Sequence, residues 1–375
     1  MLQSFSIHGY KQFSELKLDK LSNLNFFVGN NNMGKTTILE AVFAWACGLN
    51  INAIMAGIAQ KYSLIGNPYS LAESIYSLAN DRNKEIEIKF SGEYDDKIVT
   101  FIHNININGL YLGDSGSDKD FNINVNKESS IQETIINNNS FSAMPNVINR
   151  RVVAKWSIRD SKNKIINHEI AMPEFVTQEI QPYKVATFMD LLAHRLVQQI
   201  NINYSQLKRK GLLESVVERM RTVFPEVEAI DMIPYPDGST APISVKTKNK
   251  DYLPIYSFGD GFQRWFYIIS TTVLSKNSII CIDEIDATLH PSAQADFCRN
   301  LIYYAAEYNV QIFATTHNME FIDAFLGEYS KYKKNHEDYE ARIVTLKKID
   351  GQTRIRNLSG EDALQLRDEF ELELR

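Results

Sequence analysis

The chain has 375 residues, of which 44% are hydrophobic and 23% are charged. This is the composition of a folded globular protein rather than a disordered one, and the length allows one large domain or two ordinary ones. A net charge of −6 argues against a general role in coating nucleic acid, although it is compatible with a local basic groove.

The cysteines and the apolar runs indicate where the protein works. Cys47, Cys281 and Cys298 stand at unrelated spacings, so they predict neither a disulfide framework nor a zinc site, and they fit a reducing cytosol. The opening MLQSFSIHGYKQ lacks the features of a secretory signal. The best apolar run, 265–274, is shorter than the ~18–20 residues of a membrane span. We therefore expect a cytoplasmic protein that does not engage a membrane.

The first thirty residues predict strands that end at a glycine turn. Leu24–Val28 is a short apolar run typical of a buried strand. After Gly34 the apolar residues take a helical spacing, and Gly48 is a plausible end of that helix.

The middle of the chain mixes both periodicities. Residues 51–80 look helical, and from Glu85 an alternating pattern predicts antiparallel strands. The stretch 104–148 is rich in Asn, Ser and Ile and predicts an exposed inserted arm. A hairpin is expected from 152 to 170.

Two helical patterns follow the hairpin, at 187–200 and 205–223, and the apolar stripe of the second predicts core packing. From 228 onward strands and helices alternate, which predicts a parallel sheet with helices on its faces. Expected strands are 230–233, 279–282 and 310–315, expected helices are 263–274 and 292–308, and a final hairpin joins 343–346 to 353–358 through a turn at Asp350 and Gly351.

The strongest motif joins the Leu24–Val28 strand to the following helix. Its residues fit the pattern G-x-x-x-x-G-K-[ST] in full: Gly29, Asn30, Asn31, Asn32, Met33, Gly34, Lys35, Thr36 and Thr37. Such a loop turns backbone N–H groups and the positive end of a helix toward phosphate oxygens. Lys35 would reach the β- and γ-phosphates, and the Thr36 hydroxyl would bind Mg²⁺. A chance glycine turn is the alternative, and the strand–loop–helix context disfavours it.

Two carboxylates end a second apolar strand. In SIICIDE, Asp283 and Glu284 follow the strand 279–282. In a parallel sheet that also carries the phosphate loop, they would stand beside the γ-phosphate. Asp283 then suits the shell of Mg²⁺, and Glu284 suits a general base that polarises water. By itself the pair could be an acidic helix cap; together with the loop it favours a nucleotide site.

His317 closes the strand QIFATTH, where a histidine could contact the γ-phosphate. A lone histidine is more often structural, so this role depends on context. The other histidines show no metal-ligand spacing.

A second anion-binding turn precedes the Asp283 strand. Ser257, Gly259 and Gly261 open a helix, which predicts backbone donors directed at an anion, although an ordinary loop has the same composition. One loop is already expected to hold the phosphates of the ATP that this chain binds. The second turn therefore suggests a contact with the ATP that another copy of the chain binds.

In this order, "GYKQF", "NFFVGNNNMGKTTILEAV", "YSFGDGFQRW", "CIDEIDATLHP" and "FATTHNMEFI" resemble the ABC-type ATPases of the RecF, SMC and OLD group, over about residues 1–48 and 250–326. The resemblance implies an α/β fold, a P-loop NTPase head of ABC type with a mixed sheet and an inserted arm of strands and helices. We expect residues 1–50 and 225–375 to form the ATPase core and 51–224 to form the arm.

The same resemblance implies a head-to-tail dimer that encloses two ATP molecules with Mg²⁺. Each site would take its phosphate loop, Asp283, Glu284 and His317 from one copy and the Ser257 turn from the other. Gln263 and Arg264 extend that turn, residues 286–290 resemble a segment that crosses the dimer interface, and Tyr10, Lys11 or Phe13 could lie near adenine.

His290 and Pro291 favour the OLD-like branch of this AAA-type group. OLD nucleases carry a Toprim nuclease domain after this point, and residues 318–375 show no carboxylate cluster suited to one. The family's Q-loop glutamine has no convincing match. The chain thus resembles the stand-alone ATPases of two-gene bacterial anti-phage systems, which act beside a separately encoded effector such as a Toprim nuclease.

Three functions were weighed. The first is a nucleotide-driven dimeric switch that controls an effector. The alternative is a DNA-binding ATPase for repair or chromosome handling, with 150–151 and 208–210 as basic clusters, although such clusters are usually solvated surfaces. A transporter subunit fits worst, because the Ser257 turn has diverged and the 104–148 segment is polar.

Overall fold

The computed structural model divides the chain into two compact units, which are described separately. Unit 1 comprises Met1–Ser4, Leu18–Ala46 and Lys184–Arg375, and unit 2 comprises Phe5–Lys17 and Cys47–Tyr183. The structure describes residues 1–51, 75, 77–81, 85–107, 151–172, 180–233, 242–349 and 352–370.

Unit 1 is built on a six-stranded sheet with the order β15-β14-β3-β13-β12-β8. The five strands from β14 to β8 are parallel, and β15 pairs antiparallel with β14. This confirms the predicted parallel sheet. The strands are β3 (Leu24–Val28), β8 (Ala186–Met189), β12 (Ile279–Ile282), β13 (Gln311–Thr316), β14 (Ala341–Ile349) and β15 (Gln352–Ser359).

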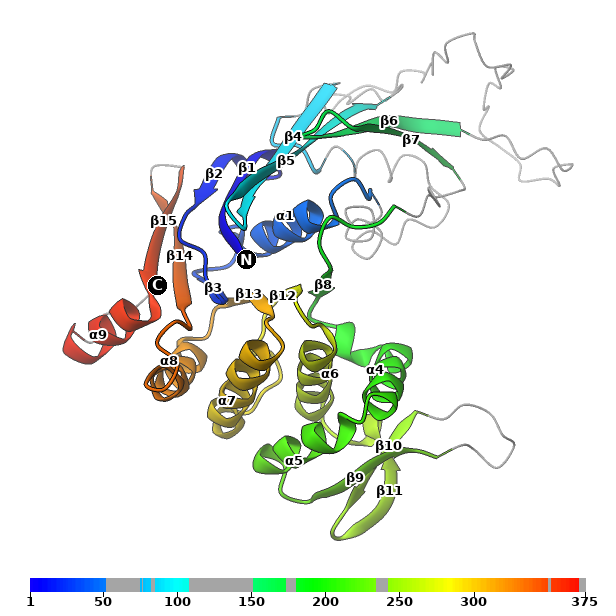
Figure 1. The fold of residues 1–375 in the computed structure, drawn as a ribbon, viewed down its shortest axis with the longest axis vertical. Coiled ribbons are helices and arrows are strands. Elements are labelled where there is room, and N and C mark those ends of the chain that lie inside the picture. Colours follow the sequence, from blue (N-terminus) through cyan, green and yellow to red (C-terminus); the bar gives the residue numbers. More distant parts are fainter. Residues whose placement is uncertain are drawn as a thin grey trace, which may run out of the picture. The chain divides into compact units, whose positions relative to one another are not determined.

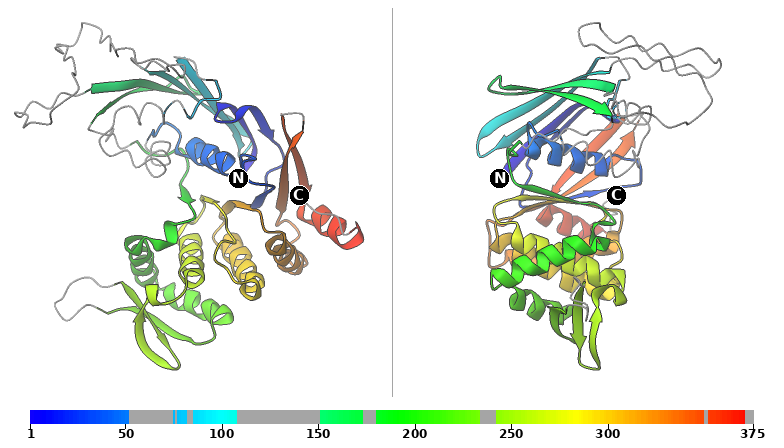
Figure 2. Two further views of the ribbon diagram at one scale, coloured as in Figure 1. Left: turned by 180° about the vertical axis from the view of Figure 1, so that it is seen from behind. Right: turned by 90° about the vertical axis from the view of Figure 1, so that its right-hand side faces the viewer.

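Helices cover both faces of this sheet. In Figure 1, α1 (Lys35–Cys47) lies on one face, and α6 (Asp260–Leu274), α7 (Pro291–Glu307) and α8 (Met319–Lys333) lie side by side on the other. The same layers are visible from behind and from the side in Figure 2. The central parallel strands are buried on both faces, since all residues of β3, β12 and β13 are buried. The last helix, α9 (Gly360–Phe370), follows β15.

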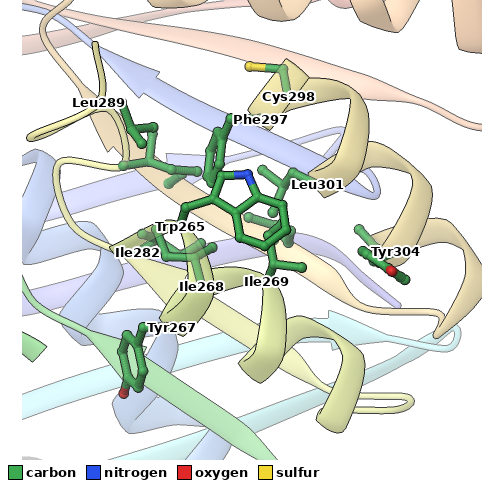
Figure 3. Close-up of a cluster of buried hydrophobic side chains, with 14 of the residues drawn as sticks. Trp265, Tyr267, Ile268, Ile269, Ile282, Leu289, Phe297, Cys298, Leu301 and Tyr304 are labelled. Carbon is green, nitrogen blue, oxygen red and sulfur yellow. The ribbon is translucent and has the colours of Figure 1, made fainter. Parts of the chain in front are cut away.

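The main core lies between the sheet and this helical layer. Trp265 of α6 is fully buried, and Figure 3 shows its indole among side chains of α7 and β12, including Phe297, Leu301 and Ile282. Burial of such large side chains supplies the main stabilising term of the unit. It also fixes α6 against β12, the strand that leads to Asp283.

Smaller elements complete unit 1. A three-stranded antiparallel sheet has the order β11-β10-β9 and contributes to the same core through Ile230 and Val245. These elements are η1 (Ala193–Arg195), α4 (Val197–Arg209), α5 (Leu213–Val223), β9 (Val227–Met232), β10 (Ile243–Thr247), β11 (Lys250–Pro254) and η2 (Ile255–Ser257).

Unit 2 contains the other large sheet, with the order β2-β1-β4-β5-β6-β7. The register of β4 with β5 and of β6 with β7 confirms the predicted antiparallel strands and the hairpin that turns at residues 161–164. Its strands are β1 (Leu2–Tyr10), β2 (Phe13–Leu18), β4 (Glu85–Tyr94), β5 (Lys97–Ile107), β6 (Arg151–Asp160) and β7 (Ile165–Met172).

The helix predicted at 187–200 is wrong from residue 187 to residue 196. Residues Ala186–Met189 form β8, which pairs with β12 at the edge of the sheet, and α4 begins only at Val197. An apolar run this short fits either periodicity, and the hydrogen bonds of the sheet edge decided it. Most of 51–80, the part of 104–148 beyond Ile107, and the Asp350–Gly351 turn lie outside the described residues.

The expected boundary of the arm at residue 224 differs from the division of the structure. Residues from Lys184 onward belong to unit 1, and Phe5–Lys17 belongs to unit 2. The reason is strand and helix pairing: β8 extends the main sheet, and Asn203 of α4 donates to Ser270 and Thr271 of α6 at 2.9 Å each.

The buried His103 of unit 2 should make the free energy of unfolding depend on pH. The Nε1 of Trp156 donates to Nδ1 of His103 at 3.3 Å, and burial lowers the pKa of His103 to about 3. Below the ordinary pKa of ~6.5 the unfolded chain therefore binds a proton that the folded chain does not. This histidine should lower the free energy of unfolding by up to ~1.4 kcal/mol per pH unit between ~6.5 and ~3.

Urea unfolding at pH 7 and pH 5 measures this effect, with a contribution from His103 of about 2 kcal/mol. His103→Phe should flatten the pH dependence by that amount. An equally steep dependence in the variant would contradict the assignment.

Candidate functional site

The phosphate loop, residues 29–37, follows β3 and includes the first turn of α1, which begins at Lys35. Three of its residues have positive φ: Gly29 at 141°, Asn32 at 63° and Gly34 at 93°. Glycine is needed at position 29 for a second reason, since a Cβ there would lie 2.6 Å from the Leu346 carbonyl oxygen of β14. The loop conformation is therefore determined by the local sequence and by the neighbouring strand.

The loop exposes its asparagines and buries its lysine. Asn30, Asn31 and Asn32 are exposed, Met33 is half-buried, and Gly29, Gly34 and Thr37 are buried. Lys35 is 9% exposed, and its Nζ donates to the carbonyl oxygens of Gly29 at 2.6 Å and Asn30 at 2.8 Å. Burial lowers the pKa of Lys35, against the opposing effect of Asp283 and Glu284. The ammonium is thus held at the loop by acceptors that a phosphate oxygen could replace.

Thr36 and Asp283 meet at the carboxyl edge of the parallel sheet. The Thr36 hydroxyl donates to the Asp283 carboxylate, at 2.9 Å to Oδ1 and 3.1 Å to Oδ2. One hydroxyl beside one carboxylate fits Mg²⁺, which usually keeps several waters and binds phosphates as well as protein. Among the described residues no group of three or more His, Cys, Asp or Glu side chains is arranged to hold a metal.

Thr315 at the end of β13 joins the two carboxylate residues, and sequence reasoning missed it. Its Oγ1 donates to Asp283 Oδ1 at 2.7 Å and accepts the backbone N–H of Glu284 at 2.8 Å. The next residue, Thr316, donates to Asp286 Oδ1 at 2.6 Å. The two consecutive threonines before His317 are the sequence feature that could have indicated this contact. Their role becomes clear only from the parallel pairing of β12 and β13, which brings them beside Asp283 and Asp286.

Glu284 has a backbone φ of 48°, which is uncommon for a residue with a side chain. His317 follows β13 directly and is exposed. The carboxyl ends of β3, β12 and β13 thus bring the phosphate loop, Asp283, Glu284 and His317 to one edge of the sheet.

The Ser257 turn, called the Ser257 loop from here on, comprises residues 256–261 and contains two glycines in different surroundings. Ser257 and Gly259 are exposed, and a Cβ on Gly259 would meet no atom within 4 Å. A Cβ on Gly261 would lie 2.5 Å from the Thr288 carbonyl oxygen. Gly259 is therefore open to a ligand, whereas Gly261 is required by packing within the same chain.

Gln263 and Arg264 do not extend this exposed turn, contrary to the expectation from the resemblance. Gln263 is 7% exposed and its Nε2 donates to the Phe258 carbonyl at 3.1 Å, while Arg264 is 2% exposed. Both side chains contact their own unit, because α6 is buried on all sides from Phe262 to Val273.

The strand β8 brings a further carboxylate to the sheet edge. Asp190 follows β8, and the backbone N–H of Asp283 donates to the Met189 carbonyl at 2.9 Å. Asp190 stands one strand from Asp283, and the wrong helix prediction over 187–200 concealed this position.

With this geometry in view, the chain was compared with known proteins. Residues 24–323 match the family model described as "AAA domain, putative AbiEii toxin, Type IV TA system". A Helicobacter pylori protein named "ATP/GTP phosphatase" is 23% identical over 344 residues, which cover 86% of this chain and 87% of that protein.

Two solved structures share the fold. An SMC head bound to the C-winged helix domain of ScpA has a TM-score of 0.53 at 12% identity, covering 96% of this chain and 99% of that one. An SMC head with an extended coiled coil, bound to the C-terminal domain of ScpA from Pyrococcus furiosus, also has a TM-score of 0.53 at 12% identity, covering 99% of both chains. The fold is thus that of an ABC-type P-loop ATPase head. Within the described part of the chain, no helix is long and apolar enough to cross a membrane.

Proposed function

Because the chain belongs to the AAA-domain family whose model spans residues 24–323, we propose that it is a Mg²⁺-dependent ATP hydrolase that works as a nucleotide-driven dimeric switch. The observation that carries this proposal is the hydrogen bond between Thr36 and Asp283. It joins the phosphate loop to the carboxylate strand, which is the arrangement that phosphoryl-transfer sites of this kind require.

The residues divide the chemistry among them. Backbone N–H groups of the phosphate loop and Lys35 bind the phosphates, and Thr36 and Asp283 hold Mg²⁺, which would offset the negative charge of the phosphates. Glu284 accepts the proton of the attacking water. His317, at the end of the neighbouring strand, contacts the γ-phosphate.

The dimer completes the nucleotide site. Ser257 and Gly259 are exposed, and the space beside Gly259 is open. They are therefore available to the ATP of a second copy at the positive end of α6. The switch then consists of a difference in the chain's affinity for a partner protein between the ATP-bound and the ATP-free state.

Ser257→Arg tests this arrangement. In a Glu284→Gln background, ATP should convert the chain to a dimer in sedimentation velocity, and Ser257→Arg should abolish that dimer. Thr222→Arg, an equal charge on an exposed position of α5, should leave it intact. A chain that stays monomeric with ATP yet hydrolyses it at the full rate would contradict the proposal.

For the biological role, we propose the regulatory ATPase of an OLD-like bacterial anti-phage system, which controls a separately encoded effector such as a Toprim nuclease. Support comes from the resemblance of the motif set to OLD-like ATPases and from a family description that names a toxin–antitoxin system. Plaque assays on cells that carry the chain with and without the neighbouring reading frame test it. Protection should require both proteins and should be lost with Glu284→Gln.

Tight DNA binding by the chain alone, with an affinity that falls steeply with salt, would instead favour the DNA-repair alternative.

A further inference from the structure

Arg264 is a charged side chain that the proposed chemistry does not use, although it lies directly beneath the catalytic carboxylates. Its NH2 donates to the backbone carbonyl oxygens of Asp283 at 2.9 Å and Glu284 at 2.7 Å, and its NH1 donates to the Leu191 carbonyl at 2.9 Å. Arg264 is 2% exposed, and a buried guanidinium is costly unless its donors are satisfied. Both terminal nitrogens of Arg264 donate to carbonyls, whereas its Nε has no hydrogen-bond partner in the described part of the chain. Its fork therefore fixes the end of β12 to α6 and to the segment after β8.

The charges around Arg264 come from the same edge of the sheet. Burial lowers the pKa of Arg264, and Asp286, Glu284, Asp283 and Asp190 oppose that effect. The guanidinium thus compensates the carboxylates electrostatically while it binds backbone oxygens rather than any one carboxylate. The carboxylates of Asp283 and Glu284 remain available to a metal ion and to water.

Glu284 needs such support because of its backbone. A left-handed conformation is unfavourable for a residue with a side chain, and it persists where neighbours hold it. The N–H of Glu284 donates to Thr315 Oγ1, and its carbonyl accepts from Arg264 and from the N–H of Ala287. The peptide of Glu284 is thus held by β13 on one side and by α6 on the other.

A second contact from α6 holds the other end of the same turn, residues 283–288. Gly261 lies against the carbonyl of Thr288, which also has a positive φ, of 67°. Positions 261 and 264 are three residues apart and share one face of the helix. One turn of α6, immediately after Ser257 and Gly259, therefore contacts both ends of the turn that carries Glu284.

We propose that Arg264 is a positioning residue that transmits the position of the Ser257 loop to Glu284. A shift of the first turns of α6 is passed to the Glu284 carbonyl, because the Arg264 side chain is buried and its guanidinium donates to that carbonyl at 2.7 Å. Engagement of the Ser257 loop by one nucleotide is thereby transmitted to the general base of the other site. This inference rests on the proposed function, since it takes Glu284 to be the base.

The test compares Arg264→Lys with wild type in the full chain, measuring kcat, KM and the Kd for ATP. Lysine keeps the charge but cannot donate to three carbonyls in the fixed geometry of the guanidinium fork. We expect kcat to fall about 10- to 100-fold, the size of effect that misplacing a catalytic group produces, with the Kd for ATP within about threefold of wild type. Arg299→Lys is the matched control, since the exposed Arg299 of α7 pairs with the buried Glu328 of α8, and it should retain the wild-type kcat.

The double variant separates positioning from a general loss of structure. If Arg264 acts through Glu284, then Arg264→Lys should reduce the residual rate of Glu284→Gln by less than about twofold. An unchanged kcat in Arg264→Lys, or equal losses in both backgrounds, would overturn the inference. Should Arg264→Lys fail to fold, Arg264→Gln, which buries no unpaired charge, is measured in the same way. If Glu284→Gln itself hydrolyses ATP at the wild-type rate, the proposed function fails instead.

Discussion

Glu284→Gln is expected to slow ATP hydrolysis by about 10²- to 10⁴-fold, the contribution that general-base catalysis usually makes. The amide has nearly the shape of the carboxylate but cannot accept the proton of the attacking water. The backbone of residue 284 is held by Thr315 and Arg264 through its N–H and C=O groups, so the substitution should leave the turn unchanged. ATP should therefore bind with its wild-type affinity.

Single-turnover hydrolysis and titration with a fluorescent ATP analogue measure these two quantities separately. Glu218→Gln is the control, because Glu218 is an exposed residue of α5, and it should hydrolyse ATP normally. An unchanged rate in Glu284→Gln would exclude Glu284 as the base. A matching loss of rate and affinity would mean that the residue acts on binding.

Lys35→Ala should have the opposite profile, with nucleotide binding weakened about 10- to 100-fold. Charge-assisted hydrogen bonds contribute ~1.5–3 kcal/mol each, and every 1.4 kcal/mol is about tenfold in Kd. Lys35 is 9% exposed and its ammonium donates to the loop carbonyls, so water cannot easily replace it. Its removal also leaves Asp283 and Glu284 without their nearest cation on the loop.

Calorimetric titration with ATP and Mg²⁺ measures this loss, and a thermal melt without nucleotide checks that the variant is folded. Lys184→Ala, on a half-buried residue before β8, controls for the loss of one positive charge. If Lys35→Ala binds ATP as tightly as wild type, the loop does not hold the phosphates in the way proposed here.

Between them the two variants separate binding from chemistry. Lys35 and Glu284 lie on the loops that follow β3 and β12, with β13 between these strands. A combined effect close to the product of the single effects would indicate independent roles, whereas strong non-additivity would indicate that Lys35 also acts in the transition state.

The sequence determined the parts of this protein that depend on short stretches of chain. The residues from Gly29 to Thr37 specify the phosphate loop because their glycines and Asn32 permit the positive φ values that the loop has. The alternation of apolar strands and helices after residue 228 specifies a parallel sheet, and the carboxyl edge of such a sheet gathers whatever follows each strand. The positions of Lys35, Asp283, Glu284 and His317 at one edge follow from those two features.

Only the tertiary structure decided which side chains support that edge and where the edge ends. The run at Ala186–Met189 is too short for its periodicity to separate helix from strand, so pairing with β12 made it β8 and placed Asp190 beside the site. The sequence places Arg264 at the start of the helix expected at 263–274, and the resemblance makes it an extension of the Ser257 turn, yet packing of α6 directs it at the backbone carbonyls of Asp283 and Glu284. Contacts of this kind depend on which helix packs on which strand, and no local pattern of residues encodes that choice.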